Sequence, residues 1–468
     1  MSLKSVRSRS MAWALCISIA LLSSCAKQEA YVPDHDDVAF SVQQVTFDTV
    51  LANRVSATKV IAIRNHSKGP VRIENLALHL GAASPFSATL DGLPLAEQRA
   101  MQLEKGDSAL IFLRLRALEG IADSVHPLRD TLYLPTKTGA LKLPIVAHHV
   151  GWLPMEALAP GQQLALPEKS VRYITAPFEI PQGAKLTLAP GSMLIFARNC
   201  GLLVKGTLEA QGTAARPILI LGDRMEAYYR SRPGQWLGIT LAKGSHDHIL
   251  SHVDLRGAVT AFQIDTLQPG DTLRFLNCRI QYSSLTALAA YSSPLDLKGC
   301  ILAQNYRHAL YLRNATANLT HCTLVCQTKL PDTRLGALVS LEANDRHGAK
   351  LQLHNSILWG DRANEIDLPD SWAVPDCFQA HNSLLKLPDH WRARSAYCHD
   401  CSFKAPNLEN HGAERYMPAK DSPARLLGDP SYAHKCPTDF WGVNRTDLAT
   451  TPDAGAAAYA LLPSKKKQ

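Results

Sequence analysis

The sequence has no cluster of positive charge and, after its first 22 residues, no long apolar run. The formal net charge of +8 is small for 468 residues, and the single basic run is Lys465 to Lys467. Nucleic-acid binding requires basic side chains gathered on one face, so no nucleic-acid partner is expected. A membrane-spanning helix needs about 20 apolar residues, which no later segment supplies.

The first 24 residues have the pattern of an export signal. Lys4, Arg7 and Arg9 form a basic region, and residues 11–22 form an apolar region too short for a stable membrane span. The following LSSC, which ends at Cys25, resembles the lipobox of bacterial lipoproteins. The resemblance implies cleavage before Cys25 and lipidation of its thiol. The alternative is an ordinary secretory signal in which Cys25 is incidental.

A lipid on Cys25 would anchor the mature protein to a membrane in the cell envelope, with polar residues 25–37 as a tether. Ala26 is not the Asp that favours inner-membrane retention in enterobacteria, so the outer membrane is the expected location. Nine of the 11 cysteines remain if Cys16 leaves with the signal and Cys25 carries lipid. An odd number argues against a fully paired disulfide framework.

Residues 38–150 alternate apolar and polar residues in short runs. KVIAIRN at 59 and ALIFLRLRA at 109 have the period of two that half-buried strands show. Runs of this spacing predict an antiparallel β-sandwich. The segment resembles the immunoglobulin-like modules beside the anchors of Bacteroidetes-type surface lipoproteins, which implies a spacer or binding platform.

Residues 151–415 repeat with the length of one solenoid coil. The segments LRFLNCRI, LDLKGCIL and ANLTHCTL place Cys278, Cys300 and Cys322 at intervals of 22 residues. Apolar residues at the first and third positions, with a polar residue between them, predict strands with one inward face. The repeat predicts a parallel β-helix of roughly ten coils whose strands pair about 4.8 Å apart.

One column of the repeat predicts a corner in every coil. His, Asn and Gly tolerate a left-handed backbone better than other residues. Residues of these types recur directly before the cysteines and their counterparts, at His252, Asn277, Gly299, His321, Asn355 and Asn382. Together with GQWLGITLAKGS at 234, the repeat resembles the pectate-lyase-like, right-handed parallel β-helix superfamily. The expected fold is all-β: a sandwich, a right-handed β-helix and a C-terminal cap, with residues 416–468 as a closing segment and tail.

A second strand recurs as TAFQI at 260, TALAA at 286, HALYL at 308 and GALVSL at 336. If Phe262, Leu288 and Leu310 point inward, alternation predicts the outward positions. They are Ala261 and Gln263, Ala287 and Ala289, Ala309 and Tyr311, and Ala337 and Val339. Such a face has neither a carboxylate nor a base, which favours packing or binding over catalysis.

Ionisable residues gather just beyond these strands, at Asp265, Arg307, His308, Arg313, Glu342 and Asp345. The resemblance implies that an enzyme of this superfamily is a polysaccharide lyase or a glycoside hydrolase. A lyase needs a base together with either a cation or an Arg, and calcium would be its cofactor. A hydrolase instead needs carboxylates that converge on one glycosidic bond. A catalytic site is expected here if one exists. The alternative is a set of solvated charges at coil edges, with no cofactor.

The remaining cysteines fall into two groups. Cys278, Cys300 and Cys322 are expected to form an inward stack of small core residues, because parallel Cβ vectors suit disulfides poorly. The second group could form one or two disulfides, which an oxidising compartment favours, or hold zinc through the CxxC pair. It consists of Cys377, Cys398, Cys401 and Cys436.

These observations favour a lipid-anchored, non-catalytic envelope protein whose coil surface binds glycan or another envelope component. Two alternatives stay open: a polysaccharide lyase or glycoside hydrolase, and a structural or adhesive stalk. The fold alone does not separate them, because one fold carries many functions.

Overall fold

Two units, both built from β-strands, make up the computed structural model. One unit contains the chain up to Leu118 together with His126–His149, and the other contains Glu119–Val125 and the chain from Val150. No helix in the part of the chain that the structure describes is long and apolar enough to cross a membrane. Residues 1–28, which include Cys25, and the basic run at 465 lie outside the described residues. The described ranges are 29–119, 123–327, 334–345, 348–368, 375–392, 396–409, 414–445 and 451–459.

The first unit is a β-sandwich of antiparallel sheets, as predicted. One core cluster joins residues of a five-stranded and a four-stranded sheet, and Phe47 stacks on Phe86 within it at 5.5 Å. Burial alternates along β9 (Ser108–Leu115), as expected for a strand with one inward face. The other strands of the two sheets are β1 (Val38–Phe40), β3 (Lys59–Asn65), β6 (Phe86–Leu90), β7 (Leu93–Pro94), β2 (Val45–Leu51), β11 (Gly139–Gly151), β10 (Ser124–Thr136) and β5 (Ala77–Leu78). The smaller elements are β4 (Val71–Ile73), β8 (Met101–Leu103) and the 3-10 turns η1 (Gly81–Ala83) and η2 (Leu95–Glu97).

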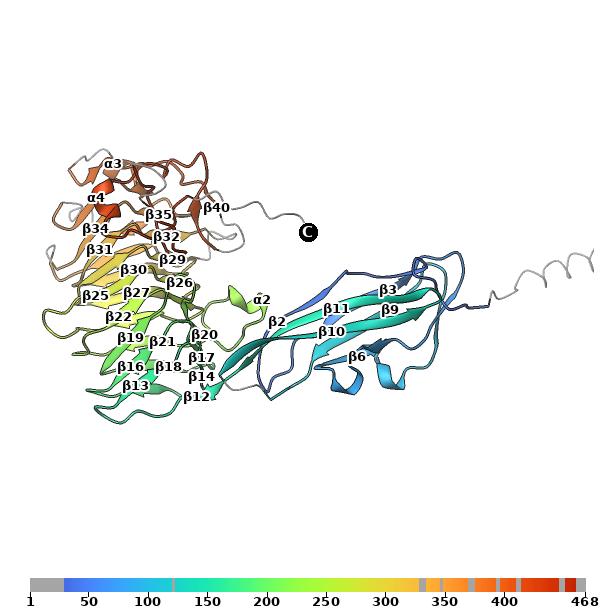
Figure 1. Ribbon diagram of the computed structural model, residues 1–468. Helices are drawn as coiled ribbons and strands as arrows, with labels where there is room; N and C mark the ends of the chain where they lie inside the picture. The colour runs from blue at the N-terminus through green and yellow to red at the C-terminus, as the bar shows by residue number, and fades with distance from the viewer. Residues whose placement is uncertain are drawn as a thin grey trace, which may run out of the picture. The chain divides into compact units, whose positions relative to one another are not determined.

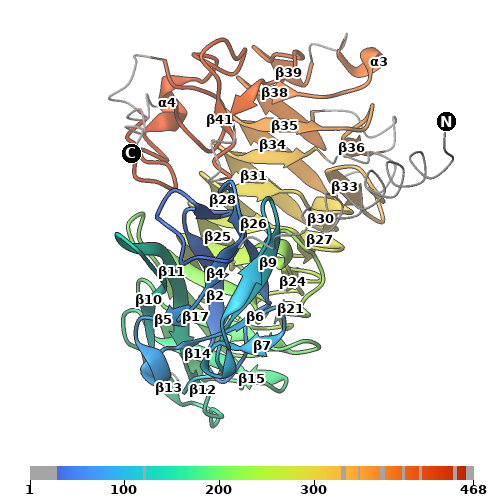
Figure 2. The ribbon, with the colours of Figure 1, turned by 90° about the vertical axis from the view of Figure 1, so that its right-hand side faces the viewer.

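The second unit is a parallel β-helix, in agreement with the predicted solenoid. A complete coil contributes one strand to each of three parallel sheets, named first, second and third in their order along a coil. Figure 1 shows the coils stacked in a column, and in Figure 2 strands of the third sheet follow one another along one side.

Within the described residues, the first and second sheets have ten strands each and the third has eight. The first sheet contains β13 (Gln163–Leu166), β16 (Lys185–Leu188), β19 (Thr207–Gln211), β22 (Ile249–Ser251), β25 (Leu273–Leu276), β28 (Leu295–Lys298), β31 (Thr316–Thr320), β34 (Lys350–His354), β37 (Phe378–His381) and β39 (Cys398–His399). The second contains β12 (Leu153–Pro154), β14 (Val171–Ile174), β17 (Met193–Phe196), β20 (Ile218–Gly222), β23 (Val253–Arg256), β26 (Arg279–Gln281), β29 (Ile301–Ala303), β32 (Thr323–Cys326), β35 (Ile357–Gly360) and β38 (Leu384–Leu385). The third contains β15 (Phe178–Ile180), β18 (Gly201–Val204), β21 (Gly238–Leu241), β24 (Phe262–Ile264), β27 (Thr286–Tyr291), β30 (His308–Arg313), β33 (Val339–Glu342) and β36 (Ile366–Asp367).

The strands of the first sheet pair in the register that the sequence columns predict. Phe275 pairs with Leu297, and Leu297 with Leu319, and all three side chains are buried. The polar residues between them, such as Asp296, face outward. Period-two alternation in an unbroken parallel ladder therefore builds a continuous apolar core, which extends through every coil.

The predicted corner is also present in each coil from β22 onward. The backbone φ angle at every residue of that column lies between 48° and 64°, and Asp400 adds a further member at 51°. Only residues that tolerate the left-handed region fit there without strain.

A small hydrogen-bond donor follows each of these corners from Asn277 onward, whereas Val253 follows His252. Cys278, Cys300 and Cys322 are buried free thiols, and each Sγ lies 3.4–3.5 Å from a main-chain carbonyl oxygen one coil earlier. Burial raises the pKa of Cys300 and of Cys322 well above the ordinary value, which keeps these thiols protonated and unreactive. Ser356, Ser383 and Cys401 continue the column and also reach carbonyl oxygens.

The C-terminal end of the core is covered by α3 (Asp389–Arg392) and the residues after it. Trp391 and Tyr397 are buried against Phe378 of the last coils. The closing segment, defined here as residues 414–445 and 451–459, lies instead along the side of the helix. It covers apolar outward residues of the second sheet, namely Ile301, Ala303, Val325, Ile357 and Leu384. The remaining short elements are α2 (Ala227–Arg230), α4 (Pro430–Ala433), β40 (Leu408–Glu409) and β41 (Met417–Pro418).

The alternation along β28 gives a direct test of the coil register. Leu297→Ala should lower the free energy of unfolding by about 2–5 kcal/mol, because it opens a cavity in the closed core. Asp296→Ala, one residue away, should cost no more than about 1 kcal/mol, because it removes only a surface ion pair with Lys298. Urea denaturation of the two variants measures the difference. Equal losses would contradict the inward assignment of Leu297.

Candidate functional site

The third sheet shows its predicted alternation in the first three of the repeated strands. Phe262 pairs with Leu288, and Leu288 with Leu310, and all three side chains are buried. Gln263 and Tyr311 face outward, as predicted. The alanines that were also expected outward are buried instead, at Ala261, Ala287, Ala289, Ala309 and Ala337.

The fourth strand differs from the prediction by one residue. Leu310 pairs with Val339 and Tyr311 pairs with Ser340, so Val339 points into the core and its outward assignment is wrong. The backbone N–H groups of Ala309 and Leu310 both donate to the carbonyl oxygen of Leu338. This bulge shifts the register of β33, and a bulge is not visible in a period-two pattern.

The corrected register places ionisable side chains on the outward face of the third sheet. The statement that this face has no carboxylate is therefore wrong. We call the set the third-sheet face, and it consists of Tyr291, Tyr311, Arg313, Ser340, Glu342 and Asp367.

Two tyrosines on neighbouring coils form the middle of the third-sheet face. The ring centroids of Tyr291 and Tyr311 are 5.8 Å apart. The Tyr311 hydroxyl donates to Glu342 Oε2 at 2.6 Å, and burial together with this carboxylate raises the pKa of Tyr311 to about 12. Arg313 pairs in register with Glu342 on the next coil. An aromatic surface therefore lies beside a guanidinium and a carboxylate.

Polar groups extend this face over one more coil. The Ser340 hydroxyl donates to Asp367 Oδ2 at 3.4 Å, and Asp367 is exposed at the end of β36. Arg307 directly precedes β30, where its backbone N–H donates to the carbonyl oxygen of Leu285. The face thus carries both signs of charge over successive coils.

His308 is buried at the start of β30, next to the third-sheet face. Its Nδ1 lies 2.8 Å from the carbonyl oxygen of Ala337, so Nδ1 bears the proton and Nε2 the lone pair. Burial lowers the pKa of His308, the bond to Ala337 opposes this shift, and Arg307 lowers the pKa further. The imidazole centroid is 6.0 Å from the ring of Tyr311. His308 is therefore a neutral base at pH 7.

The structure brings four of the six predicted residues together, namely Arg307, His308, Arg313 and Glu342. Asp265 lies one residue past β24, where its Oδ1 accepts a hydrogen bond from the N–H of Thr266 at 2.8 Å. Asp345 lies in the loop after β33 and accepts at its carbonyl oxygen from Gly348.

Sequence reasoning missed three members of this face. Tyr291 is the next outward residue after Ala289, so extending TALAA by one residue would have found it. Ser340 was hidden by the one-residue shift in the register of β33. Asp367 follows an insertion that breaks the coil period, so no repeat column pointed to it.

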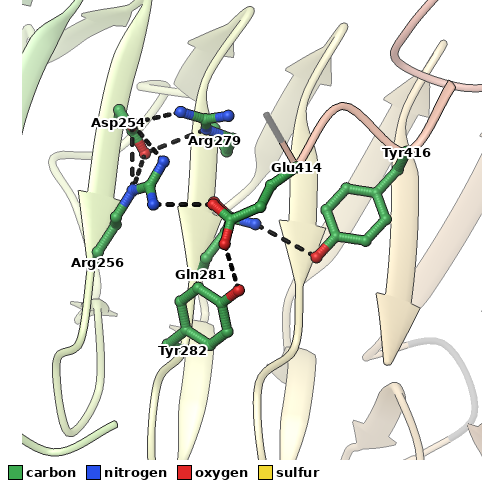
Figure 3. A network of polar contacts seen from close by, with 7 residues as sticks. All are labelled: Asp254, Arg256, Arg279, Gln281, Tyr282, Glu414 and Tyr416. Atoms are coloured by element: carbon green, nitrogen blue, oxygen red, sulfur yellow. Dashed lines mark hydrogen bonds and ion pairs between the residues drawn. The ribbon is translucent and has the colours of Figure 1, made fainter. Parts of the chain in front are cut away.

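A second group of charges lies on the outward face of the second sheet (Figure 3). Asp254 binds Arg256 and Arg279, with nitrogen–oxygen distances of 3.1 and 2.6 Å. Burial opposes ionisation of Asp254, but the two guanidinium groups outweigh it and hold the pKa of Asp254 below its ordinary value. Glu414 of the closing segment accepts from Arg256 and from the Tyr282 hydroxyl. These charges therefore bind the closing segment to the second sheet.

The second cysteine group is divided by the structure. Cys398 pairs in register with Ala380, and a hydrogen bond from its thiol lowers the pKa of Cys401. Cys436 instead lies against Asn277, with Sγ and Oδ1 3.8 Å apart. Each cysteine in the described ranges from 200 to 436 has a free thiol. No group of three His, Cys, Asp or Glu side chains suited to a metal ion occurs among those ranges, and the zinc and disulfide assignments stay predictions.

Comparisons with known proteins give no family for this chain. No family model matches it, and no curated protein matches it. Two of the solved structures that match cover 25% of the chain each. One is a PapD-like domain of human CEP192, at 10% identity over 86% of that chain with a TM-score of 0.18. The other is the YadV chaperone, at 14% identity over 52% of that chain with a TM-score of 0.17.

The protonation state of His308 can be measured directly. Burial should keep its pKa below the ordinary value of about 6.5, so its ring should be neutral, with the proton on Nδ1, at pH 7. Nitrogen NMR of histidine-labelled protein measures this, and His308→Gln assigns the signal. Arg307→Ala should raise the pKa of His308, because it removes a nearby positive charge. A His308 signal that titrates at or above the ordinary pKa would contradict this description.

Proposed function

We propose that this protein is a lipid-anchored protein of the cell envelope, located in the outer membrane, that binds an extended glycan without cleaving it. The glycan lies along the third-sheet face. Membership of the pectate-lyase-like superfamily and of a Bacteroidetes-type lipoprotein group is part of the same proposal. It rests on the sequence resemblances and on the parallel β-helix.

The pair of tyrosines on neighbouring coils is the observation that carries the binding proposal. A tyrosine ring offers an apolar surface to the face of a sugar, and its hydroxyl offers a hydrogen bond. Tyr291 and Tyr311 repeat this surface at successive coils. The parallel ladder spaces equivalent side chains by about 4.8 Å, so the surface suits an elongated ligand better than a compact one.

The polar groups beside the tyrosines would fix the orientation of a bound sugar. Glu342 is already fixed by the Tyr311 hydroxyl, and Arg313 lies opposite it on the preceding coil. Small-molecule sites typically combine an aromatic or apolar surface with a small number of polar groups around it. Carboxylate and guanidinium groups together can bind the hydroxyls of a neutral sugar and the carboxylate of a uronate.

A polysaccharide lyase or glycoside hydrolase is the second candidate, and His308 favours it. A neutral imidazole with its lone pair on Nε2 is suited to accept a proton, and the Tyr311 ring lies 6.0 Å away. Calcium would be the cofactor of such a lyase. A structural or adhesive stalk is the third candidate, and it requires no ligand on this face.

Retention on immobilised glycans tests the proposal. The folded protein should be retained by at least one member of a panel of acidic and neutral polysaccharides. Tyr311→Ala should weaken that binding by about tenfold or more, because truncating a central interface aromatic costs more than about 1 kcal/mol. Tyr228→Ala is the matched control, since Tyr228 in α2 is an exposed tyrosine away from this face.

Other outcomes of the same panel would replace the proposal. Unsaturated uronates or new reducing ends, lost in His308→Gln, would establish the second candidate. The assay is run with and without calcium for this reason. If the folded protein is retained by no glycan and releases no product, the structural or adhesive stalk is the candidate function that remains.

A further inference from the structure

Histidines line the contact between the coils and the closing segment. The rings of His354 and Tyr432 in α4 stack with their centroids 4.2 Å apart and their planes at 14°. The ring of His252 lies 6.1 Å from that of Phe440. His321 is fully buried and faces Arg445 and the backbone of Asp453 and Gly455. Three different coils thus present an imidazole to this one segment.

His354 is also the inner member of a longer stack. His381 stacks on it with centroids 5.2 Å apart, and His399 stacks on His381 at 4.7 Å. We call His354, His381 and His399 the imidazole stack. Its members are consecutive in the first sheet, because His354 pairs with His381 and His381 with His399. The parallel ladder therefore holds three titratable rings face to face.

Hydrogen bonds join the closing segment to the corners beside this stack. Asn355 donates to the carbonyl oxygen of Asp429 at 2.9 Å and accepts from its N–H at 2.8 Å. Asn382 donates to the carbonyl oxygen of Leu427 at 3.2 Å. The backbone of residues 427–429 is thus bound one residue away from His354 and His381.

We propose that this contact is an acid-sensitive clasp: protonation of His354, His381 and His321 releases the closing segment from the coils. Release uncovers the apolar outward residues of the second sheet, such as Ile301, Val325 and Ile357. The protein then presents two different surfaces at neutral and at mildly acidic pH.

Charges of both signs face these rings, and burial together with the positively charged neighbours outweighs the carboxylates and lowers the pKa of His354, His381 and His321. Lys435 and His381 face His354 and oppose its protonation, whereas Asp429 favours it. His399 opposes protonation of His381, and Asp400 and Asp429 favour it. Burial and Arg445 oppose protonation of His321. Asp439 in the closing segment acts in the opposite direction, because burial raises the pKa of its carboxyl group.

The direction in which pH changes the stability of the clasp follows from proton linkage. Burial lowers the pKa of His354 to about 4 in the closed state, against an ordinary value of 6.5. The open state binds the proton more tightly, so the clasp is intact above about pH 6.5 and weakens as the pH falls toward 4. His354 alone would favour opening by up to about 30-fold at pH 5.

Amide hydrogen exchange of the full-length protein, read by mass spectrometry and corrected for intrinsic rates, tests the clasp. Protection of peptides covering 427–436 and 451–459 should fall by about tenfold or more between about pH 7.5 and about pH 5. Residues 171–196, in histidine-free early coils, should keep their protection. An equal loss there would show general acid unfolding and would overturn the proposal.

Histidine variants separate the effect of histidine protonation on hydrogen-exchange protection from other effects of low pH. In the triple variant His354→Gln, His381→Gln, His399→Gln, the closing-segment peptides should lose much less protection between the two pH values than they do in the wild type. Glutamine suits these positions, since Gln352 and Gln379 already bond across the same two strands at 3.0 Å. His434→Gln changes an exposed histidine of the closing segment and should behave as wild type. Unchanged wild-type protection at both pH values would overturn the clasp whether or not the triple variant folds.

Discussion

The parallel pairing of each coil with the next, without offset, is the constraint on which the rest of the structure depends. It places one residue of every coil directly over its counterpart, about 4.8 Å away, so any side chain becomes part of a column. Leu297 and Leu319 form a core column in this way, and His354 and His381 form an outward one. Core, corners and surface are consequences of one register.

This constraint produces two surfaces with different chemistry. On the third sheet the columns expose tyrosines with a fixed carboxylate, which suits an elongated ligand. On the second sheet the outward residues are apolar or paired charges, so they require a cover, and the closing segment supplies it. The histidines at the edge of that cover are neutral because burial disfavours their charged form. The binding and the regulation that we propose therefore fall on separate faces of one helix.

Much of this fold could be predicted from the sequence, because short-range periodicity encodes it. The inward columns and the left-handed corner at Asn277 follow from residue types at coil spacing. The candidate site was predicted less well: Arg313 and Glu342 were found, but the one-residue shift in the register of β33 hid Ser340, and an insertion hid Asp367. The course of the closing segment could not be predicted, because its contacts are long-range. Cys436 and Asn277, for example, are 159 residues apart in the chain.

A crystal structure of the protein with an oligosaccharide from a retained glycan tests the central claim most directly. The account predicts sugar rings over Tyr291 and Tyr311, with hydroxyl or carboxylate groups bound by Arg313 and Glu342, extending along successive coils. Sugar bound on the first sheet, on the sandwich or against the closing segment, with the third-sheet face unoccupied, would contradict it.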